Sequence, residues 1–352
     1  MQIEEIAAWV VGQHLSVHRD WAEFRMTTNP CASDHFKNGR FFNPGVLPQS
    51  FAKFLKWVTR RKIGPWRRFV TTPPGPRPAD RVSGSQLRVT FVNHSTFLLQ
   101  SESFNILTDP VWSERVSPVS FLGPRRHRNP GILFEDIPPI DCILISHNHY
   151  DHLDMPTLKR LASQHQSAVF CPHGLAGLMA RAGFKEVYSL DWWQLHAWKG
   201  LRLHCVPAQH FSSRTPFDRN RTLWCGWVVE YADGPVYFAG DTGFGNHFAA
   251  INAQFDAFRL ALLPIGGFKP EWFMGPIHMT PEEAVEAHRI LNSQTSVAMH
   301  FGTFALADDG ETEPTCRLNA CLGWSQDASE FWTLSEGESR NVPRSATNRS
   351  EC

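Results

Sequence analysis

The chain has 352 residues, 42% of them hydrophobic and 19% charged, and its 34 basic residues balance its 34 acidic residues. This composition is typical of a globular protein with a sizeable core, and the zero net charge gives no support to a nucleic-acid partner. No stretch approaches the roughly 20 apolar residues that a transmembrane helix needs. The opening MQIEEIAAWVVGQH lacks the positive charge of a secretory signal, and eight scattered cysteines without a CxxC pair indicate reduced thiols in a cytoplasmic protein.

Residues 1–80 are predicted to be an N-terminal extension, which ends in the proline-rich linker candidate TTPPGPRPAD. Four apolar residues in it fall at helical spacing: Phe51, Phe54, Leu55 and Val58. Residues 53–68 carry seven basic residues and no acidic one, so an amphipathic helix with cationic surroundings is expected. Two interpretations stay open, because the segment could dock on a membrane surface or pack its aromatic residues onto the domain that follows.

From Gln86 onward, short apolar runs alternate with helical patterns. Strands are predicted at residues 87–92, 96–99, 104–107, 142–146, 168–170, 201–206, 224–231, 236–239 and 261–264. One helix is expected to begin near Asp154 and Pro156, and another at Thr280, where TPEE is a capping box with proline at the first helical position. This order predicts an α/β or α+β layered domain over residues 81–340 and a flexible tail at 341–352.

The densest group of polar residues is the run SHNHYDHLD at residues 146–154, which follows an apolar strand. It holds four candidate metal ligands within six residues: His147, His149, Asp151 and His152. His147 and His149 alternate as strand residues do, so both side chains project to one side. A lone histidine is more often structural, but four clustered ligands are hard to explain by packing. Imidazole and carboxylate together suit zinc, or manganese or iron, and the run therefore predicts a metal site.

This run resembles the signature of the metallo-β-lactamase superfamily. The resemblance implies an αβ/βα sandwich, in which two mixed β-sheets are flanked by helices and the metals lie at the open edge between the sheets. The remaining expected ligands follow in chain order, each after a strand-like run: His210 in VPAQHFSSR, Asp241 in YFAGDTG and His300 in AMHFGTF. By the same resemblance the protein holds two zinc ions, the first on His147, His149 and His210. The second lies on Asp151, His152 and His300, and Asp241 bridges the two.

Three further residues are weaker candidates for the site. Asp109 in LTDP could accept the free ring N–H of a metal-bound histidine, or it could be an ordinary turn aspartate. His94 in VNHST either lines the cleft or caps a turn. His278, just before the capped helix, is a candidate to face the site and donate to a phosphate, with an isolated structural histidine as the alternative.

A longer series of motifs is similar to N-acylphosphatidylethanolamine-hydrolysing phospholipase D and its bacterial relatives. The series runs from GRFFNPG through VNHSTFLL and LPIGGFKPEWFM to MHFGTFAL, from about residue 39 to about residue 306, and the rest of the N-terminal region matches poorly. The resemblance implies a zinc phosphodiesterase that cuts this lipid into N-acylethanolamine and phosphatidic acid, with a hydroxide between the metals as nucleophile. Asp241 would bridge and orient, and Asp151 would handle the proton.

Other classes of protein stay open at this point. A metal-dependent lactonase or other small-molecule hydrolase would share all seven ligands, because activated water serves carbonyl and phosphoryl centres alike. A catalytically silent binding protein would be expected to lack a ligand, and all seven are present. The expected partner is a phospholipid or another phosphodiester, with the protein in the cytoplasm or peripherally on a membrane, and no oligomeric state is predicted.

Overall fold

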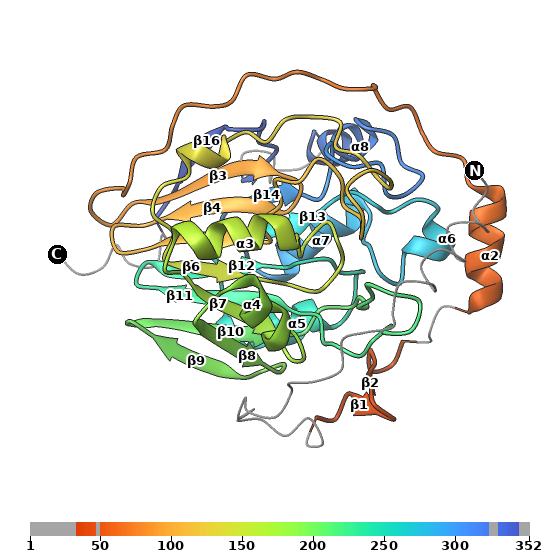
Figure 1. Ribbon diagram of the computed structural model, residues 1–352, viewed down its shortest axis with the longest axis horizontal. Helices are drawn as coiled ribbons and strands as arrows, with labels where there is room; N and C mark the ends of the chain where they lie inside the picture. The colour runs from red at the N-terminus through yellow and green to blue at the C-terminus, as the bar shows by residue number, and fades with distance from the viewer. Residues whose placement is uncertain (1–32, 47–49, 324–329, 345–352) are drawn as a thin grey trace. The chain divides into compact units, whose positions relative to one another are not determined.

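A computed structural model describes residues 33–46, 50–323 and 330–344 (Figure 1). One seven-stranded sheet has the spatial order β16 (Ser339–Val342), β3 (Leu87–Asn93), β4 (Thr96–Gln100), β5 (Asn105–Thr108), β6 (Cys142–Leu144), β7 (Ala168–Pro172) and β8 (Glu186–Leu190). Strand pairs from β16 to β5 are antiparallel, and those from β5 to β8 are parallel. This sheet is therefore mixed, as predicted.

The second seven-stranded sheet has the spatial order β15 (Phe331–Trp332), β14 (Ser296–Met299), β13 (Leu260–Pro264), β12 (Gly234–Phe238), β11 (Gly226–Tyr231), β10 (Leu201–Val206) and β9 (Leu195–Trp198). It too is mixed, because β9 to β12 pair antiparallel and β12 to β15 pair parallel. A separate two-stranded ribbon joins β1 (Phe36–Lys37) to β2 (Arg40–Phe41). The predicted architecture of two mixed sheets with flanking helices is confirmed.

The core lies between the two sheets and continues under the helices that cover the first one. Successive side chains of a strand point to opposite faces, so Cys142 and Leu144 of β6 join the core between the sheets, while Ile143 packs on the helix side. On that side Leu158 and Leu161 of α3 (Met155–Gln164) and Met179 of α4 (Ala176–Ala182) meet it. β6 is thus buried on both faces, and this packing holds in place the strand that leads into the histidine-rich run.

Four further helices of the described part follow strands of the second sheet along the chain. They are α5 (His247–Phe255), α6 (Glu271–Met274), α7 (Pro281–Ile290) and α8 (Glu313–Leu322), and a short 3-10 turn, η2 (Phe134–Asp136), precedes β6. α7 packs on β13 and contacts both α5 and α8. Its predicted capping box is confirmed, because Thr280 Oγ1 accepts from Glu283 N at 3.2 Å and Glu283 Oε2 accepts from Thr280 N at 2.8 Å. Within the ranges that the structure describes, no helix is both long and apolar enough to cross a membrane.

The described part of the predicted N-terminal extension contains α2 (Phe51–Arg60), which confirms the expected helix. The chain after it runs along the segment before β6, because Val70 N donates to His127 O at 2.7 Å and Gly75 N donates to Gly131 O at 2.8 Å. The domain boundary near residue 80 stays a prediction. Residues 341–342 of the predicted tail belong to β16, where Val342 pairs with Leu87, and residues 345–352 lie outside the described part, as do residues 1–32.

Candidate metal centre

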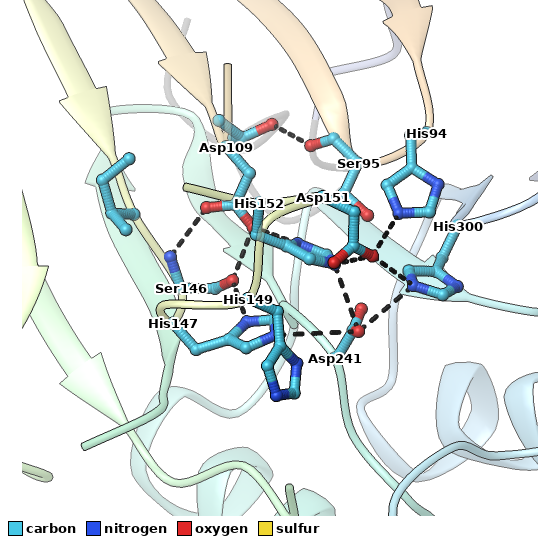
Figure 2. A network of polar contacts seen from close by, with 12 residues as sticks. His94, Ser95, Asp109, Ser146, His147, His149, Asp151, His152, Asp241 and His300 are labelled. Atoms are coloured by element: carbon cyan, nitrogen blue, oxygen red, sulfur yellow. Dashed lines mark hydrogen bonds and ion pairs between the residues drawn. The ribbon is translucent and has the colours of Figure 1, made fainter. Parts of the chain in front are cut away.

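The polar residues singled out in the sequence come together at the ends of strands from both sheets (Figure 2). In the first sheet, His147 follows β6 and Asp109 follows β5, while His94 lies in the turn between β3 and β4. In the second sheet, three residues follow β10, β12 and β14 in turn: His210, Asp241 and His300. Parallel strands bring their carboxyl ends to one edge, so the position of each candidate after a strand is what gathers them.

The candidate ligand atoms of the described residues fall into overlapping groups, within each of which all atoms lie within 4.8 Å of one another, and two of these groups have four members. One group consists of His147, His149, His210 and Asp241, and the other of His94, Asp151, His152 and His300. Asp241 Oδ2 also lies 3.1 Å from Nε2 of both His152 and His300, and 3.9 Å from His147 Nε2. The structure thus brings together the residues predicted for each zinc ion, with Asp241 close to both groups and His94 in the second, and their role as ligands stays a prediction.

The hydrogen bonds behind the rings decide which nitrogen atoms face the centre. His210 Nδ1 lies 2.9 Å from Ile277 O, and His152 Nδ1 lies 2.7 Å from Asp109 Oδ2. These oxygens only accept, so Nδ1 carries a hydrogen in both rings and Nε2 faces the centre. Burial alone would lower the pKa of His152, but the carboxylates of Asp241 and Asp151 outweigh it and raise this pKa well above its ordinary value, so without a metal Nε2 directs a hydrogen toward Asp241 Oδ2 at 3.1 Å. A divalent cation would take the place of this hydrogen between ring and carboxylate, so the residues fit a metal such as zinc.

The electrostatic field of the buried carboxylates favours a bound cation at the centre. Burial lowers the pKa of His149 to about 4 and that of His210 to about 3, which keeps both rings in the neutral form that binds metals. Burial also acts to lower the pKa of His300, but the carboxylates of Asp241 and Asp151 outweigh it and raise the pKa to about 9. The field that holds a proton on this ring is the field that would attract a divalent cation.

Asp109 and Ser146 form a layer of hydrogen bonds behind the histidines. Asp109 accepts from the His152 ring and from Ser146 N, each at 2.7 Å, so the hydrogen bond predicted for Asp109 is confirmed. Ser146 Oγ lies 2.9 Å from His147 Nδ1 and also donates to Asp109. Sequence reasoning assigned no role to Ser146, although its place between a buried strand and the first histidine is the signal that could have found it.

His94 faces the centre. Its Nε2 donates to Asp151 Oδ2 at 2.9 Å, because the carboxylate only accepts, and its ring lies 4.2 Å from that of His300. The φ angles of His94, Asp109 and His300 are 49°, 31° and 60°, a left-handed region that non-glycine residues rarely occupy. Such strain is common at functional sites, where the surrounding contacts hold it in place.

His278 lies beside both groups, with its ring 5.0 Å from that of His210 and 5.1 Å from that of His300. Its Nδ1 is buried and has no hydrogen-bond partner among the described residues. Gly267, in the LPIGGF motif, has a φ of 77°, and a Cβ there would lie 3.3 Å from His278 Nδ1 and 3.2 Å from His300 Cε1. The motif alone does not show that its second glycine leaves room for both rings.

The fold and the site together define a metal-dependent hydrolase of the metallo-β-lactamase fold. Residues 104–301 match the family model of the beta-lactamase superfamily domain. The solved structure of a metallo hydrolase from the archaeon Ignicoccus hospitalis shares this fold, with a TM-score of 0.56 and 22% identity, covering 74% of this chain and 100% of that one. The chain therefore belongs to the metallo-β-lactamase superfamily.

Within this superfamily, several relatives cover most of the chain, among them the following two. An N-acyl-phosphatidylethanolamine-hydrolyzing phospholipase D of Caenorhabditis elegans is 36% identical over 270 residues, which cover 73% of this chain and 76% of that protein. An uncharacterized protein of Mycobacterium tuberculosis is 39% identical over 300 residues, which cover 82% of this chain and 79% of that protein. The resemblance to phospholipases D of this type that the sequence motifs indicate is thus confirmed.

Proposed function

We propose that this protein is a zinc-dependent phosphodiesterase that hydrolyses N-acylphosphatidylethanolamine to N-acylethanolamine and phosphatidic acid. The observation that carries the proposal is the 36% identity with the phospholipase D of C. elegans over 270 residues. The convergence of seven candidate ligands in two groups supports it, because a phosphodiester carries a negative charge that a cationic centre would attract.

In this proposal the seven ligands divide between two zinc ions. His147, His149 and His210 hold the first, Asp151, His152 and His300 hold the second, and Asp241 contacts both. Zinc bound there would supply an activated water near neutral pH and would neutralise the charge that builds up on the phosphate.

The side chains around the ligands would orient the reaction and move its proton. Asp241 Oδ2 lies 3.1 Å from Nε2 of both His152 and His300, and from there it would orient the attacking water toward phosphorus. Asp151, whose Oδ2 accepts from His94 at 2.9 Å, would accept the proton that this water loses. His278 Nδ1, which has no partner among the described side chains, is available to donate to a phosphate oxygen.

Hydrolysis in heavy-oxygen water tests the reaction type. Incubation with N-acylphosphatidylethanolamine is expected to place the label in the phosphate of the released phosphatidic acid, and an Asp241→Asn variant should release almost none. Label in a free fatty acid instead would show acyl hydrolysis. Turnover of lactones without phosphodiester cleavage would favour the alternative, a lactonase or other small-molecule hydrolase of this fold.

A further inference from the structure

α2 is an amphipathic helix on the surface of the protein, and none of its residues is buried. Its apolar side chains remain in contact with solvent, because Phe51 is 76% exposed, Leu55 51% and Phe54 44%. Trp272 of the neighbouring helix α6 is 44% exposed, and the Lys56 ammonium lies 4.8 Å above its ring. Single exposed apolar residues are ordinary on a protein surface, but four large ones on two adjoining helices indicate a contact surface.

The structure divides the basic residues of this region into two sets. Arg61 pairs with Asp308 at 3.1 Å and Arg67 pairs with Glu311, so both hold the chain to the loop after His300. A second set lies exposed on α2 and has no acidic partner among the described residues: Lys53, Lys56 and Arg60. Residues 35–79 contain no aspartate or glutamate at all, so these cations also lack a counter-ion close in sequence. The outer set is therefore available to an anionic partner.

α2 is attached to the elements that carry the metal centre. The Trp57 ring stacks on Phe273 of α6 at 5.1 Å, and its indole donates to Asp308 at 3.3 Å (Figure 1 shows α2 beside α6). α6 leads directly into Ile277, whose carbonyl accepts from His210, and into His278. Whatever α2 contacts is thus linked to the centre through one short helix.

We infer that α2 and Trp272 form a docking surface for an anionic lipid membrane. Phe51 and Leu55 would enter the boundary of the acyl chains, and Trp272 suits the headgroup level. The cations of the opposite helix face would lie among lipid phosphates, where each is worth about 1 kcal/mol. The inference rests on the proposed lipid substrate and adds how the centre reaches it, because α6 joins the docked helix to His278.

Co-sedimentation with vesicles tests the surface without requiring turnover. The full chain, made inactive by Asp241→Asn, should bind vesicles that contain phosphatidylglycerol and bind pure phosphatidylcholine far more weakly. Lys53→Gln with Arg60→Gln should weaken binding to the anionic vesicles roughly thirtyfold, since two cations account for about 2 kcal/mol. Phe51→Ser with Leu55→Ser should weaken binding to both kinds of vesicle.

A matched control removes two exposed charges elsewhere, by Lys159→Gln with Lys185→Gln, and should leave vesicle binding unchanged. Unfolding midpoints check that every variant folds. Unaltered vesicle binding in both α2 variants would overturn the inference. It would also be overturned if α2 only joined two copies of the chain, in which case Phe51→Ser with Leu55→Ser would halve the molecular mass measured for the protein without α2 substitutions. Vesicle binding through α2 in a protein that leaves N-acylphosphatidylethanolamine intact would instead overturn the proposed function alone.

Discussion

Replacing Asp109 by asparagine tests how the layer behind the ligands controls the centre. Asp109 accepts from Ser146 N and from His152 Nδ1, each at 2.7 Å. Asparagine has the same size, but its Nδ2 is a donor. The backbone N–H of Ser146 cannot change its role, so the amide oxygen must face it and Nδ2 must face His152. The ring hydrogen then moves to Nε2 and points at Asp241, where a lone pair is needed for zinc.

The expected result is a zinc affinity about 10-fold to 100-fold weaker than in the unaltered chain, the usual cost of losing a partner behind a ligand. This corresponds to roughly 1.4–2.7 kcal/mol. Competition with a chromophoric chelator measures the affinity, and urea unfolding of the metal-free proteins checks that the variant folds. Asp256→Asn makes the same chemical change at an exposed position and is the control. Equal affinities in a folded Asp109→Asn variant would refute the claim that Asp109 sets the tautomer of His152.

Three further substitutions separate ligands, chemistry and stability. His149→Ala should leave about one zinc per chain and abolish turnover, and elemental analysis that still finds two would contradict the ligand assignment. His278→Ala should keep the full zinc content but slow turnover by about 100-fold to 1,000-fold, as the loss of one donor to a developing charge does; loss of zinc would make it a ligand instead. Thr280→Ala breaks the capping box of α7 and should lower the free energy of unfolding by about 1 kcal/mol, measured in urea, with zinc content unchanged.

The sequence predicts most of the strands that lead to the site because these are buried and therefore apolar, whereas β14, which is also buried, is indicated only by a strand-like run before His300. β6 and β13 are buried along their whole length, whereas β9 and β16 lie at sheet edges and alternate or expose their side chains. Edge strands such as SRNV are defined by pairing with a distant strand, here β3, and no local pattern shows this. For this reason β9 and β16 are not among the strands that the sequence predicts.

In the candidate site, too, features set by neighbouring residues could be predicted from the sequence and contacts between distant residues could not. His147, His210, Asp241 and His300 each stand within four residues of an apolar strand, so their places at strand ends could be predicted. The partners behind the ligands could not, because His210 and Ile277 are 67 residues apart and His94 and Asp151 are 57 apart. The sequence left the role of His94 open for this reason, and only the pairing of the strands decided it.

Each of the two ligand groups takes residues from both sheets. His147 and His149 follow β6 of the first sheet and share a group with His210 of the second, while His152 and His300 join the sheets in the other group. Cations bound as we propose would each connect residues of the two sheets. Each would add about 4 kcal/mol to the free energy of unfolding at a free zinc concentration a thousand times its Kd. At the opposite end of these strands the sheets are joined without metal, because the Arg259 guanidinium before β13 donates to Val342 O of β16 at 3.0 Å and to Pro343 O at 2.8 Å. A chain without zinc should therefore unfold first at the end of the sheets that carries the metal centre. The supply of metal would then govern the lifetime of the protein as well as its turnover.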